Sequence, residues 1–163
     1  MNLIGEHTDY NEGFVLPAAI DFYCWAAAAP RGHGKLVIYS ENFNETIEAR
    51  LDSLSPLPEK HWANYPLGVA WALRRAGKPI SGANVYIAGE VPLGAGLSSS
   101  AAVEVSVAFA LLRQSGDAEN RAELAKLCQK QRTSSWARAL ELWTSLFRAS
   151  GARRMRFCWI AAR

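Results

Sequence analysis

A short stretch rich in glycine and serine carries the clearest chemistry in this chain. Gly94 and Gly96 are followed by Ser98, Ser99 and Ser100. Glycine lets the backbone approach a ligand without a Cβ in the way, and N–H groups at a helix N-terminus bind anions, most commonly phosphate. The serine hydroxyls can cap a helix, or contact phosphate or a Mg²⁺ ion. As a bare pattern, the stretch is equally compatible with a phosphate loop and with an ordinary capped turn.

The flanking sequence predicts the elements that position this stretch. An apolar run with β character at 85–88 leads into it, and a run rich in Ala, Val and Leu at 101–114 leads out. Strand, glycine loop and helix in this order predict an anion site at the helix N-terminus. No Lys follows Gly96, so the stretch is not a Walker A loop. Ser99 stands where a dinucleotide fingerprint has its third glycine.

A second polar cluster lies near the N-terminus, where Glu6, His7 and Asp9 fall close together. Densely spaced donors and acceptors on a loop can bind the hydroxyls of a sugar, but the residues alone favour an ordinary polar loop. A metal site on the same three side chains is a weaker alternative, because their spacing matches no standard helical ligand set.

Two motifs resemble those of one enzyme family. The stretch at 91–102 resembles the ATP loop of the GHMP kinases, which include galactokinase, homoserine, mevalonate and phosphomevalonate kinases. Residues 2–21 resemble the signature of the galactokinase branch, and the two motifs stand in the family's order. The resemblance implies that galactose hydroxyls are bound by Glu6, His7, Thr8 and Asp9. It also implies that ATP phosphates are bound by Gly94, Ala95, Gly96, Leu97, Ser98, Ser99 and Ser100, with Ser100 the candidate Mg²⁺ ligand.

The resemblance further implies a reaction and a fold. The reaction is ATP-dependent phosphorylation of α-D-galactose at the anomeric hydroxyl, which yields galactose 1-phosphate. The fold is α/β (α+β), with a first domain like the second domain of ribosomal protein S5, and a second α/β domain that these residues do not reach. The alternatives are a non-catalytic galactose- or ATP-binding fragment, another GHMP kinase, or a fragment that does not fold stably. Expected partners are galactose and ATP, with no nucleic acid and no membrane, and the expected state is a monomer.

Hydrophobic periodicity predicts the remaining elements. Trp62 and Trp71 are expected in the core, with Trp62 alternatively lining a pocket, and His33 is expected at the surface in a glycine turn. The predicted strands lie at 22–29, 35–40 and 46–51, and the predicted helices at 62–75 and 120–130.

Composition bounds the class of protein. Half of the residues are apolar, which is enough for a core, and no apolar run is long enough to cross a bilayer. The first residues lack the basic and apolar regions of a secretory signal. Three scattered cysteines, Cys24, Cys128 and Cys158, match neither a disulfide framework nor a zinc pattern. A reducing, cytoplasmic setting is therefore expected.

Charge divides the chain into two unequal parts. Residues 1–131 carry 11 Lys and Arg against 14 Asp and Glu, a net −3. Residues 132–163 carry seven Arg, no Lys and only Glu141, a net +6, together with three of the six tryptophans. Arginine with interleaved tryptophan is also a pattern of nucleic-acid binding. However, an arginine-rich, lysine-free segment is what a wrong reading frame of a GC-rich gene yields.

Codon arithmetic favours the wrong-frame hypothesis. Residues 131–136 can be encoded so that the neighbouring frame reads Ala-Glu-Asn-Glu-Phe-Val, and residues 142–145 so that the same frame reads Ile-Met-Asp-Gln. Both are segments that the resemblance implies at this place. We therefore expect residues 1–130 to be a GHMP kinase N-terminal domain, incomplete at its N-terminus, and 131–163 to be an out-of-frame tail. A genuine divergent tail is the alternative.

The absence of the family's segments from residues 131–163 also bears on the expected activity. In the family, the missing segments carry a Mg²⁺-binding Glu and the Asp proposed as base, and an Arg before Asn2 is thought to stabilise the transferring phosphate. No catalytic residue is therefore assigned in this chain. Losing one charged transition-state contact costs about two to four kcal/mol, so the loss of several predicts that this chain has little activity.

Overall fold

The structure is a computed structural model that describes residues 2–4, 16–58, 61–116 and 121–132. Near the N-terminus, β1 (Asn2–Ile4) pairs antiparallel with β2 (Leu16–Pro17). The main sheet contains β3 (Cys24–Pro30), β4 (Lys35–Ser40), β5 (Glu45–Arg50) and β6 (Ala83–Gly89). The helices are α1 (Asn64–Arg75), α2 (Ser99–Gln114) and α3 (Arg121–Arg132), and a 3₁₀ turn, η1 (Leu51–Ser53), follows β5.

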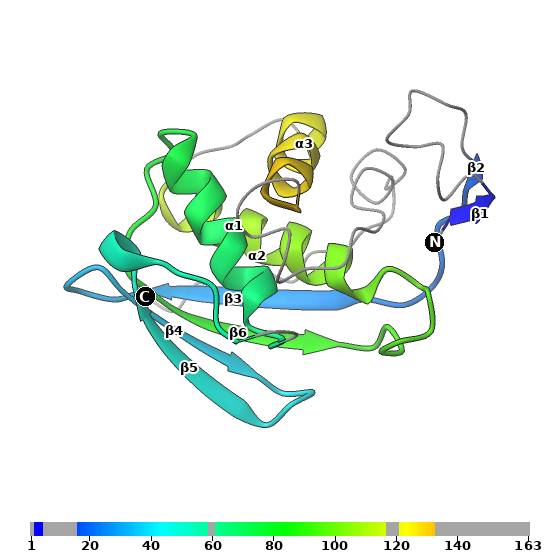
Figure 1. Ribbon diagram of the computed structural model, residues 1–163, viewed down its shortest axis with the longest axis horizontal. Helices are drawn as coiled ribbons and strands as arrows, with labels where there is room; N and C mark the ends of the chain where they lie inside the picture. The colour runs from blue at the N-terminus through cyan, green and yellow to red at the C-terminus, as the bar shows by residue number, and fades with distance from the viewer. Residues whose placement is uncertain (1, 5–15, 59–60, 117–120, 133–163) are drawn as a thin grey trace.

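The strand of the main sheet that comes last in the sequence, β6, occupies a central position in the sheet. The strand order is β3-β6-β4-β5, so that β6 lies between two strands that are consecutive in the sequence (Figure 1). β6 pairs antiparallel with β3 and parallel with β4, and β4 forms an antiparallel hairpin with β5. A parallel pair needs a crossover connection, which here runs from β4 through β5 and α1 to β6.

The helices cover one face of the sheet. Figure 1 shows α1 and α2 lying over the strands, and α3 packs against both of these helices. Burial alternates along the strands accordingly: Val85 and Ile87 on β6 are buried, whereas Tyr86 between them is exposed. This period of two is expected for a sheet that is covered on one side. The largest buried core side chains include Leu36, Ile38, Leu67, Leu73, Leu111, Leu112 and Leu124.

Helix α2 is buried over most of its length. Its apolar residues between Ala101 and Leu112 pack against β3, α1 and α3. Glu104, one turn along from Ser100, is also fully buried, and it takes part in a polar or electrostatic interaction. None of the helices in the described ranges is long and apolar enough to cross a membrane.

The sequence-based assignment of elements is largely confirmed. The strand at 35–40 coincides with β4, and the strands at 22–29 and 46–51 match β3 and β5 with shifts at their ends. The helix predicted to begin at Trp62 begins at Asn64, because residues 62 and 63 form a turn. Trp62 and Trp71 both pack against the core, and His33 is exposed.

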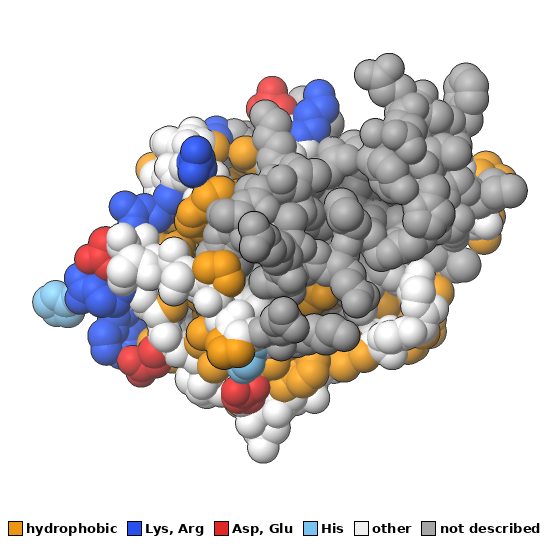
Figure 2. Space-filling view, in the orientation of Figure 1, with side chains coloured by type: hydrophobic (Ala, Val, Ile, Leu, Met, Phe, Trp, Pro, Cys, Tyr) orange, Lys and Arg blue, Asp and Glu red, His pale blue; other side chains and the backbone are white. Residues whose placement is uncertain are grey.

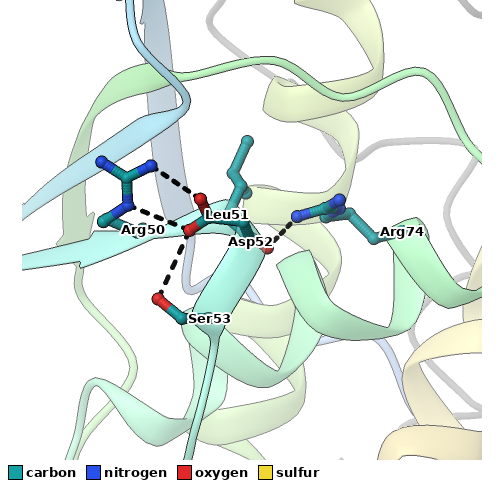
Figure 3. Close-up of polar contacts among 5 residues, drawn as sticks. All are labelled: Arg50, Leu51, Asp52, Ser53 and Arg74. Carbon is teal, nitrogen blue, oxygen red and sulfur yellow. Dashed lines mark hydrogen bonds and ion pairs between the residues drawn. The ribbon is translucent and has the colours of Figure 1, made fainter.

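Helix α1 is tied to the end of β5 by its own last turn. Arg74 donates a hydrogen bond from Nη1 to the carbonyl oxygen of Leu51 (Figure 3). Beside it, Arg50 makes two hydrogen bonds to the carboxylate of Asp52, at 3.0 and 2.6 Å, and Ser53 donates a third at 3.3 Å. The hydrogen bond from Arg50 holds the pKa of Asp52 below its ordinary value, and the same contact raises the pKa of Arg50.

Candidate functional site

The loop between β6 and α2 has left-handed backbone at every second position. The φ angles are +71° at Gly94, +67° at Gly96 and +58° at Ser98. Such alternation is typical of backbone concavities that gather N–H groups around an anion. A Cβ added at either glycine would meet nothing within 4 Å. In the structure, glycine is therefore required here by backbone conformation and not by crowding.

Ser98 does not cap helix α2 with its side chain, although capping was one of the roles that the sequence left open for the serines. Ser98 occupies the N-cap position, but its hydroxyl makes no capping hydrogen bond. A capping side chain normally reaches the first-turn N–H groups from extended backbone, whereas Ser98 is left-handed. Its carbonyl oxygen instead accepts the N–H of Ala102 at 3.2 Å. The N-cap hydroxyl thus does not cap the positive end of the helix dipole, the end that attracts anions.

The loop and the helix N-terminus border a cavity of about 660 Å³. The lining residues come from the starts of β3 and α2, the end of β4 and the β4–β5 turn, the segment before α1 and its first turn, and the end of β6 with its loop. They are Cys24, Ser40, Asn42, Phe43, Trp62, Tyr65, Ile87, Gly89, Val91, Leu93, Gly94, Gly96, Ser98, Ser99, Ser100 and Val103. The volume lies in the range typical of small-molecule sites.

Part of the cavity wall is aromatic. The rings of Phe43 and Trp62 are stacked, with their centroids 5.6 Å apart and their planes 7° from parallel. Tyr65 also lines the cavity, from the first turn of α1. Flat aromatic surfaces favour planar rings as ligands. The cavity therefore joins a wall suited to a planar ring to a loop suited to an anion.

No ionised side chain lies among the described residues that line the cavity. Lys and Arg side chains instead gather at the far end of the molecule, where α1 ends and β4 begins (Figure 2). In the described part of the site, anionic groups would thus be held by backbone N–H groups, hydroxyls and the helix dipole.

The turn between β4 and β5 is fastened to the end of β6. Asn42 donates from Nδ2 to the carbonyl oxygen of Gly89 at 2.7 Å, and its Oδ1 accepts the N–H of Gly89 at 2.8 Å. Glu41 donates its backbone N–H to the carbonyl of Ile87 at 2.9 Å. Sequence reasoning missed this contribution of Asn42 and Phe43 to the site. No local motif marks them, because the sheet brings them to the loop.

The described residues supply few metal ligands. In the described ranges, no cluster of three His, Cys, Asp or Glu side chains could hold a metal. Ser100 lines the cavity and offers a single hydroxyl. Mg²⁺ in nucleotide sites is held by one or two carboxylates together with substrate phosphates. Among the described lining residues, Ser100 is thus the predicted ligand, and no carboxylate stands beside it.

The predicted site residues are accounted for as follows. Gly94, Gly96, Ser98, Ser99 and Ser100 line the cavity. Ala95 and Leu97 belong to the same loop but are not among the lining residues. The sugar-site prediction, Glu6, His7, Thr8 and Asp9, lies outside the described residues. The structure thus brings the predicted nucleotide loop into one cavity and does not test the sugar cluster.

Comparison with known proteins agrees with both sequence motifs. The galactokinase galactose-binding signature matches residues 1–30, and the GHMP kinase N-terminal domain matches residues 64–135. Galactokinase from Streptomyces coelicolor is 47% identical over 131 residues, which is 80% of this chain and 34% of that protein. This chain belongs to the galactokinase branch of the GHMP kinases. Galactokinase from the archaeon Thermococcus kodakarensis is 40% identical over 131 residues, 80% of this chain and 36% of that protein.

Solved structures place the fold in the same family. A crystal structure of Lactococcus lactis galactokinase in complex with galactose matches with a TM-score of 0.76 at 38% identity, over 87% of this chain and 37% of that one. Mevalonate kinase from Methanococcus jannaschii has a TM-score of 0.58 at 18% identity, over 75% of this chain and 40% of that one, which shows a shared fold. The predicted GHMP N-terminal fold is confirmed. The galactokinase-family chain spans about a third of the length of the curated relatives that it matches.

Proposed function

We propose that these residues form the ATP-binding region, with part of the sugar-binding region, of a galactokinase that phosphorylates α-D-galactose at its anomeric hydroxyl. One observation carries the proposal. The N-terminus of α2 and the left-handed glycine–serine loop border one cavity with an aromatic wall, in a chain that has the galactose-binding signature. A nucleotide has the matching parts, namely a planar base and a polyanionic tail.

Each part of the site has a role in this proposal. Residues 94–100 bind the phosphates, and the base lies against Phe43 and Trp62. Glu6, His7, Thr8 and Asp9 fix the galactose hydroxyls, and Ser100 adds one oxygen to a Mg²⁺ that arrives with ATP. Bound Mg²⁺ would neutralise charge on the phosphates. The contribution of the protein is to position the phosphate chain, which is most of what phosphoryl transfer asks of an enzyme.

The proposal includes the state of the chain itself. Residues 131–163 are an out-of-frame tail, so the family's carboxylate base is not supplied by this chain and its own phosphoryl transfer falls below detection. Nucleotide sequence across residues 125–163 decides this part: the neighbouring frame should encode Ala-Glu-Asn and Ile-Met-Asp-Gln. We place the chain in the cytoplasm, in keeping with three scattered cysteines that match no disulfide framework, and we expect a monomer.

Calorimetry on the 163-residue chain tests the binding role. ATP with Mg²⁺ and D-galactose should each bind, whereas mevalonate and homoserine should not. The variant Gly96→Ala should weaken ATP binding about tenfold, because a Cβ disfavours the left-handed backbone that shapes the loop. Gly32→Ala is the matched control, since a Cβ at Gly32 also meets nothing but its φ is not left-handed.

The possible results separate the alternatives. ATP and galactose binding without turnover in a coupled ADP-release assay agrees with the proposal as a whole. Turnover at ordinary kinase rates, about 1–100 per second, would refute the inactive tail. Binding of mevalonate or homoserine in place of galactose would assign the chain to another branch. If no ligand binds, although the chain melts cooperatively, the binding role is wrong.

A further inference from the structure

We propose that Glu45 is a positioning residue for nucleotide binding, whose carboxylate fixes the Trp62 indole in the aromatic wall of the cavity. The inference rests on the proposed nucleotide role of that cavity. Glu45 does not line the cavity and is therefore not itself a ligand-binding residue.

The carboxylate of Glu45 holds two neighbouring side chains at once. Its Oε2 accepts a hydrogen bond from Trp62 Nε1 at 2.5 Å, and its Oε1 lies 3.3 Å from His61 Nε2. Glu45 is the first residue of β5, whereas His61 and Trp62 lie just before α1. The contact therefore joins two segments that η1 and the loop after it separate in the sequence.

The indole is held on its edge and on its face. Glu45 accepts a hydrogen bond from the Nε1–H edge of Trp62, while the indole ring stacks on Phe43 of the β4–β5 turn. That turn is itself fixed to β6 through Asn42 and Gly89. An indole N–H donates only one hydrogen bond, so a single charged acceptor determines where this edge of the ring points. The orientation of the aromatic wall is thus coupled to the strand that leads into the glycine loop.

The exposure of the side chains indicates what the Glu45 carboxylate does. Glu45 is 43% exposed and His61 is 27% exposed, so this is not a deeply buried pair that the fold needs for stability. His61 also accepts the N–H of Ala63 at Nδ1, at 3.2 Å, which orients its ring toward Glu45. Of the two side chains that the carboxylate contacts, Trp62 is the one that lines the cavity. The carboxylate therefore acts on the site by fixing the position of the Trp62 ring.

The test compares Glu45 with Glu48 on the same strand. Glu48 pairs with Lys35 at 3.1 Å on the surface and does not line the cavity, so that Glu48→Ala is the matched control. Two probes are titrated into the 163-residue chain: ATP, and inorganic tripolyphosphate, which has no base. Glu45→Ala should weaken ATP about tenfold and leave tripolyphosphate unchanged, since only the base meets the aromatic wall. Glu45→Gln should recover most of the ATP affinity, because an amide oxygen still accepts the indole N–H.

A second readout needs no nucleotide. In ¹⁵N–¹H spectra, the Trp62 indole N–H signal, assigned with Trp62→Phe, should shift and exchange faster with water in Glu45→Ala but not in Glu48→Ala. An unchanged indole signal would overturn the positioning role. So would equal ATP affinities of Glu45→Ala and Glu48→Ala, or an equal loss for ATP and tripolyphosphate. If the unmodified chain binds no ATP, the proposed function fails, and the indole signal still decides whether Glu45 fixes Trp62.

Discussion

The side-chain amide of Asn42 pairs with the backbone of Gly89 through two hydrogen bonds, 2.7 Å to the carbonyl and 2.8 Å from the N–H. This pair imitates one rung of a β-ladder, because the amide supplies one donor and one acceptor to a single residue. It joins the β4–β5 turn to β6 at the point where β6 leaves the sheet for the glycine loop.

Replacing Asn42 with alanine should therefore lower the stability of the protein. We expect Asn42→Ala to lower the free energy of unfolding by about 1–2 kcal/mol, because two hydrogen bonds to Gly89 are lost. Asn84→Ala is the control, since exposed Asn84 on β6 makes one surface contact with Arg31 and should cost about 0.5 kcal/mol or less. Urea unfolding measures both, and equal effects would contradict the role given to the pair.

Asn64 should be one of the most sensitive polar positions. It is fully buried at the start of α1, where its side chain accepts the N–H of Leu57 at 2.8 Å and donates to the Leu57 carbonyl at 3.2 Å. Asn64→Ala leaves both backbone groups without these partners, at a cost of about 2–3 kcal/mol. Thermal unfolding checks this, and a loss no larger than that of Asn84→Ala would show that water replaces the amide.

Substitution of a loop glycine by alanine should lower the stability of the protein through backbone conformation alone. Nothing lies within 4 Å of a Cβ added at Gly94, but its φ is +71°. We therefore expect Gly94→Ala to destabilise the protein by about 1–2 kcal/mol. Gly32→Ala, which has equal space but lacks positive φ, should be neutral or slightly stabilising. Urea unfolding of the two variants should separate conformation from crowding.

The Arg50–Asp52 pair should give a small pH-dependent contribution. The hydrogen bond from Arg50 lowers the pKa of Asp52, so its stabilising effect is present above the unfolded pKa, near about 4. The effect is lost as pH falls through the lower folded pKa. Asp52→Asn should therefore be less stable than the parent at about pH 7, and the difference should shrink as the pH falls below about 4. Both side chains are exposed, so high salt should shrink the difference.

How much the sequence could predict depended on how local each signal was. The strand at 35–40 was predicted with its observed bounds because a short β-prone run, Leu36 to Tyr39, follows directly on a glycine turn. The glycine loop was recognised because glycine spacing and helix onset are local features. Whether a serine caps the helix was left open, because composition does not reveal that Ser98 takes left-handed backbone.

The aromatic wall was only partly foreseen, for a physical reason. Trp62 was considered as a pocket residue, but Phe43, Asn42 and Glu45 were not. They reach the site because β4 and β6 pair in parallel, with Ser40 opposite Ile87, which places the turn after β4 beside the end of β6. Strand register of this kind is set by the whole sheet and leaves no short-range pattern.

The strand order also sets a demand on synthesis. β3 and β4 leave the ribosome together but never pair, because the slot between them is reserved for a strand made much later, β6. Until Gly89 has emerged, the nascent chain carries unpaired strand edges that invite contacts with other chains. A domain with this strand order should fold slowly and depend on chaperones during translation.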